Sequence, residues 1–146
     1  MFQHILLATD GSAASAHAAQ LAVDLARVHG ARLTALYVAD PYPYLGVGEA
    51  NPLGFQAYQA AGQQLASQAH AQVEALCRQG ATQVPLQVKL VEEVAAAHGI
   101  VETARADGVD LIVLGSHGRT GIARLMLGSV ATKVVAESSV PVLVAR

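Results

Sequence analysis

The feature that most constrains the fold is a regular alternation between short apolar runs and longer segments with helical spacing. The first apolar run is FQHILLA at residues 2–8, and after it Ala18, Leu21, Leu25 and Val28 recur at helical spacing. Short strands that are almost wholly apolar are typical of a parallel sheet covered by helices on both faces. The same alternation continues along the chain and predicts an α/β fold.

The predicted elements follow the order β-α-β-α-β-α-β-α-β, which implies a doubly wound, five-stranded parallel sheet. Strands are expected at residues 2–8, 32–38, 83–91, 111–114 and 140–144, with the fourth in a central position. Helices are expected from Ser12 to Gly30, over a long segment ending near Gly80, and over 94–107 and 129–137.

Several details of these elements can be predicted from single residues. Pro85 and Pro141 favour edge positions for the third and fifth strands, because proline cannot donate to a ladder of hydrogen bonds. Phe55, Tyr58 and Leu65 share one face of the long helix and are expected in the core. A chain of 146 residues favours a single domain over 1–146.

Composition excludes some classes of protein. The hydrophobic fraction is 53% and the aromatic fraction only 4%, so the core must consist of Ala, Val, Leu and Ile. A net charge of −2 argues against broad electrostatic binding to nucleic acid or to an anionic membrane. No basic and apolar leader with a cleavage site precedes the first strand, so we expect a cytoplasmic protein.

Ligands of doubly wound sheets bind outside the carboxyl ends of the strands, where the strand order reverses. Three strand ends are therefore informative: Ala8-Thr9-Asp10-Gly11, Val38-Ala39-Asp40, and Leu114-Gly115-Ser116-His117-Gly118. Ser12 is expected to cap the first helix.

The third strand end opens the stretch GSHGRTGIARLMLGSV, residues 115–130, which contains four glycines. Gly128-Ser129 falls where a helix begins, and free N–H groups at such a point favour an anion. Arg119 and Arg124 are nearby cations. The stretch matches neither GxxxxGK[ST] nor GxGxxG. Two interpretations stay open on these grounds: a phosphate site, or glycines that only turn the chain and a serine that only caps.

The spacing of this stretch resembles the nucleotide-binding signature of the universal stress protein family, in its ATP-binding subgroup. The signature consists of Gly115-x-x-Gly118, nine further residues, and Gly128-Ser129. HILLATDGS at 4–12, DLIVLGSHGRTG at 110–121 and PVLVAR at 141–146 also resemble segments of that family. The resemblance thus covers nearly the whole chain.

The resemblance implies a flavodoxin-like domain, related to the adenine-nucleotide alpha hydrolases, with strand order 3-2-1-4-5. It places Asp10 at the adenosine part of ATP and the main chain of Val38 at the adenine. Leu114 and Gly115 would border the ribose. The expected nucleotide-binding residues are Ala8, Thr9, Asp10, Val38, Leu114, Gly115, His117, Gly118, Arg119, Gly128, Ser129 and Val130, with the last three and Gly118 holding the phosphates through backbone N–H groups.

The expected cofactor is ATP, and Mg²⁺ can accompany its phosphates. No protein-only metal site is expected, because the histidines show no metal-ligand spacing with one another or with Cys77. His117 is expected to hold the loop, and no residue stands out as a general base, so hydrolysis should be slow or absent. No catalytic residue is therefore assigned.

The leading functional hypothesis is a nucleotide-dependent regulator in stress or signalling. The alternatives are a slow ATPase or nucleotidyl-transfer enzyme using the same site, and a dimeric interaction module with a purely structural glycine loop. The last strand, Val140 to Val144, is an apolar edge that invites pairing with a second copy, and the resemblance also implies a homodimer through it.

Overall fold

A computed structural model describes residues 1–42, 52–117 and 127–146. These residues form a sheet of five strands in the order β3-β2-β1-β4-β5, with every neighbouring pair parallel, and four helices. Along the chain the elements are β1 His4–Ala8, α1 Ala13–His29, β2 Arg32–Ala39, α2 Pro52–Arg78, β3 Leu86–Glu92, α3 Ala96–Ala106, β4 Leu111–Gly115, α4 Ser129–Glu137 and β5 Val142–Ala145. The predicted α/β class and strand order are confirmed.

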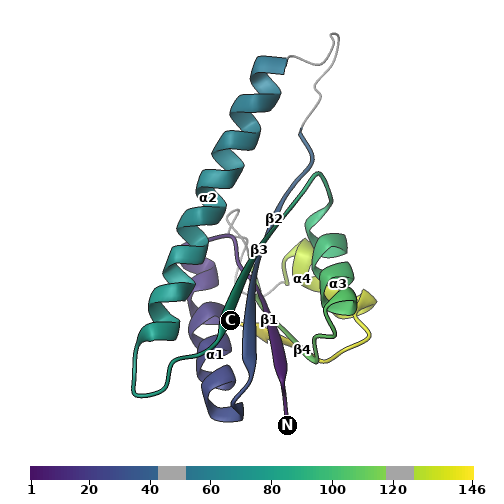
Figure 1. Cartoon of the computed structure of the whole chain (residues 1–146). Coiled ribbons are helices and arrows are strands. Elements are labelled where there is room, and N and C mark those ends of the chain that lie inside the picture. Colours follow the sequence, from purple (N-terminus) through teal and green to yellow (C-terminus); the bar gives the residue numbers. More distant parts are fainter. Residues whose placement is uncertain (43–51, 118–126) are drawn as a thin grey trace.

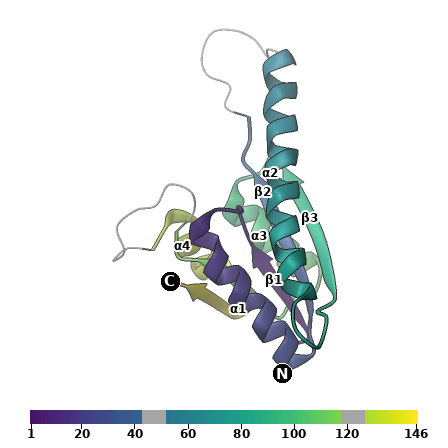
Figure 2. The same cartoon turned by 90° about the vertical axis from the view of Figure 1, so that its left-hand side faces the viewer.

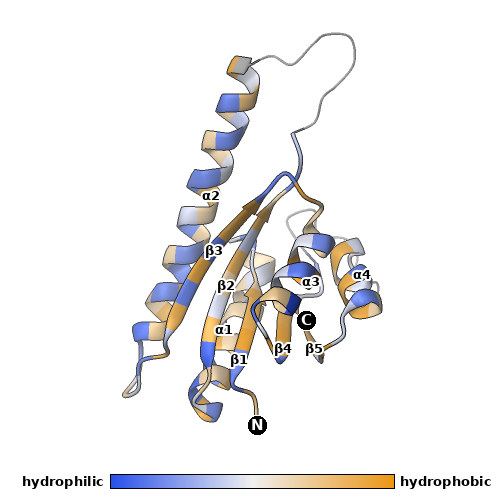
Figure 3. Cartoon of the chain, turned by 45° about the vertical axis from the view of Figure 1, so that its right-hand side comes forward, coloured by the Kyte–Doolittle hydropathy of each residue, from blue (hydrophilic) through white to orange (hydrophobic). Residues whose placement is uncertain are grey.

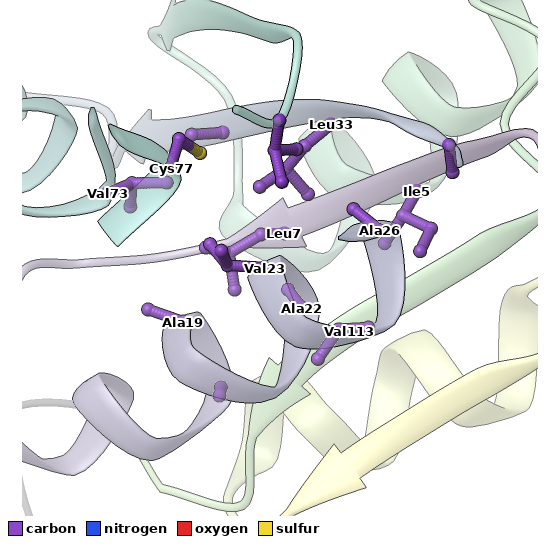
Figure 4. Close-up of a cluster of buried hydrophobic side chains, with 14 of the residues drawn as sticks. Ile5, Leu7, Ala19, Ala22, Val23, Ala26, Leu33, Val73, Cys77 and Val113 are labelled. Atoms are coloured by element: carbon purple, nitrogen blue, oxygen red, sulfur yellow. The ribbon is translucent and has the colours of Figure 1, made fainter. Parts of the chain in front are cut away.

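Helices cover both faces of the sheet (Figure 1). On one face α1 and α2 pack over Ile5, Leu7 and Leu33, in a cluster that includes Val23 and Cys77 (Figure 4). On the other face the core residues of α3 and α4 pack against Leu6, Leu36 and Ile112. The strands carry the apolar surface of both layers (Figure 3), which explains why the inner strands β1 and β4 read as nearly unbroken apolar runs.

The order of the strands creates one switch point. The chain moves outward from β1 through β2 to β3, then crosses to β4 on the other side of β1. In the register of the sheet, Ala8 is paired with Leu36 of β2 and with Leu114 of β4. The carboxyl ends of β1 and β4 therefore lie side by side where the order reverses, as ligand sites in such folds require.

The prolines mark edges as predicted, but they shorten the strands. β3 and β5 are the two outer strands of the sheet. β3 begins at Leu86, directly after Pro85, and β5 covers Val142–Ala145 where 140–144 was predicted. The missing N–H of a proline explains why each strand starts just after it. Two other elements are also shorter than predicted: β1 begins at His4 and not at residue 2, and α3 covers Ala96–Ala106 and not 94–107.

The prediction for the long helix is wrong in one respect. Ala66, Ala69, Val73 and Cys77 are buried, and Leu65 packs against the buried cluster of Tyr37, Ala66 and Ala69. Phe55 and Tyr58, in contrast, are only half-buried and join none of the core clusters among the described residues. A helix of 27 residues measures about 40 Å, while the eight residues of β2 cover about 26 Å. The N-terminal part of α2 consequently projects past the sheet (Figures 1 and 2). We call this part, residues 52–59, the overhang.

Candidate functional site

The end of β1 is held by Thr9, which is buried. Its backbone N–H donates to the carbonyl of Leu36 (3.0 Å), so Thr9 extends the pairing with β2. Its Oγ1 accepts from the N–H of Gly11 (3.2 Å) and lies 3.3 Å from Ser15 Oγ. The Thr9 hydroxyl thus serves the turn between β1 and α1.

Asp10 and Ser12 complete this turn. Asp10 Oδ1 accepts from the N–H of Ser12 (2.9 Å), and Ser12 Oγ accepts from the N–H of Ser15 (3.3 Å). Ser12 is the N-cap of α1, as predicted. Gly11 has a φ of +74°, and a Cβ there would lie 3.0 Å from Ala69 Cβ of α2. Conformation and close packing both require glycine at this position.

Ser116 connects the end of β4 to β5 and to the start of α4, a role that the sequence did not reveal. Its N–H donates to the carbonyl of Ala145 in β5 (2.7 Å), and its own carbonyl accepts from the N–H of Gly128 (2.7 Å). The start of α4 is therefore fixed next to the end of β4. The available signal was a polar residue directly after an apolar strand that ends in glycine.

Close backbone contacts explain two glycines of the signature. A Cβ on Gly128 would lie 2.9 Å from the carbonyl oxygen of Ser116, closer than real Cβ atoms approach. A Cβ on Gly115 would lie 3.3 Å from the carbonyl oxygens of both Ala14 and His117. Glycine at these positions lets β4, α1 and α4 converge. This structural requirement holds with or without a ligand.

The first turn of α4 presents backbone donors. Gly128 is its N-cap, and within the described ranges no side chain caps this end. The first intrahelical bond runs from the N–H of Thr132 to the carbonyl of Gly128 (3.0 Å). The N–H groups of Ser129, Val130 and Ala131 precede that bond and have no intrahelical acceptor. Ser129 and Val130 are exposed, so this turn is suited to an anion.

His117 lies between β4 and the start of α4. Its Nδ1 is 3.0 Å from Ser116 Oγ. Its Nε2 is buried and, in the part of the chain that the structure describes, has no hydrogen-bond partner. The role of His117 in holding the loop stays a prediction, because the loop itself lies outside the described residues.

Val38 lies farther along the neighbouring strand, two residues beyond Leu36. Its side chain is half-buried and points toward α3, where a Cβ on Gly99 would lie 3.1 Å from its two methyl carbons. The side chain is thus part of the packing under α3. The main chain of Val38 and Ala39 forms the end of β2.

The predicted residues thus fall into two groups. Ala8 is paired with Leu114, so Thr9 and Asp10 follow β1 at the edge of the sheet where Gly115 and His117 follow Leu114. Ser116 joins the end of β4 to Gly128, which Ser129 and Val130 follow in α4. Val38 is on the adjacent strand. Gly118 and Arg119, and with them Arg124, fall outside the described residues. A hollow of about 420 Å³ lies elsewhere, between the C-terminal end of α2 and the beginning of β3.

Among residues 1–42, 52–117 and 127–146, no three His, Cys, Asp or Glu side chains gather in a way that could hold a metal ion. In the same ranges, no helix combines the length and apolar character needed to cross a membrane.

The fold and the arrangement of the strand ends define a doubly wound α/β domain with its switch point between β1 and β4. The chain belongs to the universal stress protein family, because the model of that family matches residues 1–146.

Known relatives agree with this assignment. A universal stress protein of Thermus aquaticus is 37% identical over 147 residues, which cover 100% of both chains. Another, from Methanocaldococcus jannaschii, is 32% identical over 146 residues, which cover 100% of this chain and 83% of the relative. The solved structure of the universal stress protein UspA from Lactobacillus plantarum superimposes with a TM-score of 0.86 at 27% identity. That superposition covers 99% of this chain and 98% of the other.

Proposed function

We propose that this protein binds ATP at the switch point and acts as a nucleotide-dependent regulator in stress or signalling. The observation that carries the proposal is the first turn of α4, which Ser116 holds beside the paired ends of β1 and β4 and on which no side chain of the described residues forms a cap. A helix N-terminus with free N–H groups favours an anion, and this one is exposed at the place where ligands of such sheets bind.

In this proposal the phosphates lie against the N–H groups of Ser129 and Val130, together with Gly118 and Arg119. The adenosine part lies over Asp10, Gly115 and the main chain of Val38. Mg²⁺ enters with the phosphates, since oxygen atoms of the nucleotide are ligands that it prefers. Gly128 acts indirectly, because its N–H is already bonded to Ser116.

Structural neighbours bind related ligands. One universal stress protein structure is in complex with cAMP (TM-score 0.70, 24% identity), and one from Archaeoglobus fulgidus is in complex with dAMP (TM-score 0.64, 18% identity). At these identities the likeness establishes a common fold. The choice of ATP for this chain rests on the resemblance of its glycine spacing to the signature of the ATP-binding subgroup.

Little or no hydrolysis is part of the proposal. Among the described residues near the start of α4, His117 is the best candidate for a general base. Its Nδ1 lies 3.0 Å from Ser116 Oγ. A general base must reach the proton that it removes within about 2.6–3.2 Å. With Nδ1 engaged and Nε2 buried, neither ring nitrogen faces an attacking water, which favours a positioning role over acid-base chemistry.

The test is a charge placed at the helix N-terminus. Ser129→Asp should leave the fold intact, because a carboxylate in the first turn of a helix is favourable by about 0.3–1 kcal/mol. It should abolish ATP binding in calorimetry through repulsion of the phosphates. Ala136→Asp adds the same charge to an exposed position near the other end of α4 and should leave binding unchanged. ATP binding by wild type that survives in Ser129→Asp would place the phosphates elsewhere.

The homodimer is a second part of the proposal. β5 is an outer strand, and its Val142, Leu143 and Val144 are only half-buried. Half-buried valines and leucine on an open edge favour pairing with a second copy. Sedimentation at micromolar concentration should show a dimer, and Val144→Lys should convert it to a monomer. A wild-type protein that sediments only as a monomer would refute this part.

A further inference from the structure

An aromatic cluster lies where the chain leaves β2, at the base of the overhang. The ring of Tyr42 is 5.3 Å from that of Tyr58 and 5.7 Å from that of Phe55, and both contacts are edge-to-face. Aromatic pairs in this geometry stabilise beyond their buried area. Since Tyr42 follows β2 and the other two rings belong to α2, the cluster attaches the overhang to the end of β2.

Hydrogen bonds reinforce this attachment at two strands. The Tyr58 hydroxyl donates to the carbonyl of Asp40 (2.8 Å), one residue after the end of β2. One position along the helix, Gln59 Nε2 donates to Glu92 Oε2 (3.1 Å) at the end of β3. Tyr58 therefore holds β2 and Gln59 holds β3.

The Tyr58 hydroxyl is kept in its donor form. Burial raises the pKa of Tyr58, and the carboxylates of Asp40 and Glu93 raise it further. The phenol stays protonated over the physiological range and can donate to the Asp40 carbonyl throughout it.

We propose that Tyr58 is a positioning residue for base recognition: by holding the Asp40 carbonyl it fixes the main chain at the end of β2, and so sets the preference for adenine. This inference rests on the proposed function, in which the main chain of Val38 meets the base. β3 holds Val38 and Ala39 from one side, in register with Val91 and Glu92. Asp40 is the first residue beyond this pairing, and the bond from Tyr58 holds it there, two residues from Val38.

Adenine and hypoxanthine provide the discriminating probes. At its N1 and C6 positions adenine offers an acceptor and a donor, whereas hypoxanthine offers a donor and an acceptor. A main chain fixed to match adenine therefore penalises ITP, and a main chain that is free to shift penalises it less. The phosphates of the two nucleotides are identical, so the ratio of their dissociation constants isolates the base.

The variant is Tyr58→Phe, which keeps the ring and removes only the hydroxyl. The ATP dissociation constant should rise about three- to tenfold, as for the loss of one hydrogen bond, and the preference for ATP over ITP should shrink by a similar factor. Gln59→Met is the matched control, because it removes the neighbouring bond to β3. It should leave the preference unchanged.

A second readout needs no nucleotide. Amide hydrogen exchange in peptides covering residues 38–42 should become faster in Tyr58→Phe than in wild type or Gln59→Met. If neither the exchange nor the ATP-to-ITP preference changes in Tyr58→Phe, the role of Tyr58 is overturned, while the proposed function is not affected. Equal losses for both nucleotides mean a merely structural role and overturn the role of Tyr58 as well. A wild-type protein that binds neither nucleotide overturns the proposed function, and this inference with it.

Discussion

α1 and α4 begin at adjoining strand ends, yet their first turns differ. At α1, side chains accept two N–H bonds: Asp10 binds the N–H of Ser12, and Ser12 Oγ binds the N–H of Ser15. At α4, the N–H of Gly128 is bound by a main-chain carbonyl, and within the described residues no side chain caps the turn. The start of α1 is thus stabilised by side chains of its own turn, whereas the start of α4 presents main-chain N–H donors to a ligand.

The largest effect is expected when a side chain is added at Gly128, the N-cap of α4. In Gly128→Ala the new Cβ would lie 2.9 Å from the Ser116 carbonyl oxygen, so backbone must move. We expect the free energy of unfolding to fall by about 1–3 kcal/mol, as for overpacked sites. ATP affinity should fall at least about tenfold, which corresponds to about 1.4 kcal/mol, because the first turn shifts with the backbone. Urea unfolding and calorimetry measure the two effects, and wild-type values in both would contradict the contact.

A pair of serine variants separates the two helix starts. Ser12→Ala removes the cap of α1 and should cost about 1 kcal/mol in unfolding free energy, with ATP affinity unchanged. Ser129→Ala removes an exposed hydroxyl from α4 and should change stability by less than about 0.5 kcal/mol. In the proposed site the Ser129 hydroxyl is a further donor to the phosphates beside its N–H group. The ATP dissociation constant should therefore rise about threefold or more in Ser129→Ala, as for one lost hydrogen bond. If Ser129→Ala lost as much stability as Ser12→Ala, the Ser129 side chain would cap α4, and the difference between the two helix starts would not exist.

The amino end of β1 offers a pH-dependent test of stability far from both helix starts. His4 is buried, and its Nε2 lies 2.8 Å from Thr34 Oγ1. Burial lowers the pKa of His4 below 6.5, and Arg32 lowers it further, while Asp107 and Asp110 act in the opposite direction.

Because the folded state disfavours the charged form, the contribution of His4 to stability is fully present above pH 6.5. It is lost as the pH falls below that value toward the folded-state pKa. His4→Gln keeps a polar partner for Thr34 but does not titrate. Between pH 7.5 and 5.0, urea unfolding should show a smaller loss of stability in this variant than in wild type. Equal losses would show that His4 is protonated equally in the folded and unfolded states.

The core of the fold could be predicted from the sequence because burial on both faces leaves an unmistakable pattern in LIVL and HILLA. The overhang could not. Phe55 and Tyr58 continue the spacing of a core face, and only the length of β2 determines that the sheet ends before it reaches them. Ser116 was also missed, because it acts largely through its main chain, which any residue type supplies. Of the candidate site, the strand ends were predicted, and their convergence through Gly128 and Ser116 was not.

The smallest expected effect comes from a glycine that no contact requires. Gly62 lies inside α2, and a Cβ there would have only Ala39 Cβ within 4 Å, at an ordinary 3.8 Å. Gly62→Ala should therefore stabilise the protein by about 0.5–1 kcal/mol, because glycine is a poor helix former in an interior position. The same substitution at Gly128 should destabilise. Thermal or urea unfolding of the two variants side by side measures the difference between a glycine kept for close approach and one that is not. A loss of stability in Gly62→Ala would show that α2 packs more tightly on the end of β2 than these distances allow.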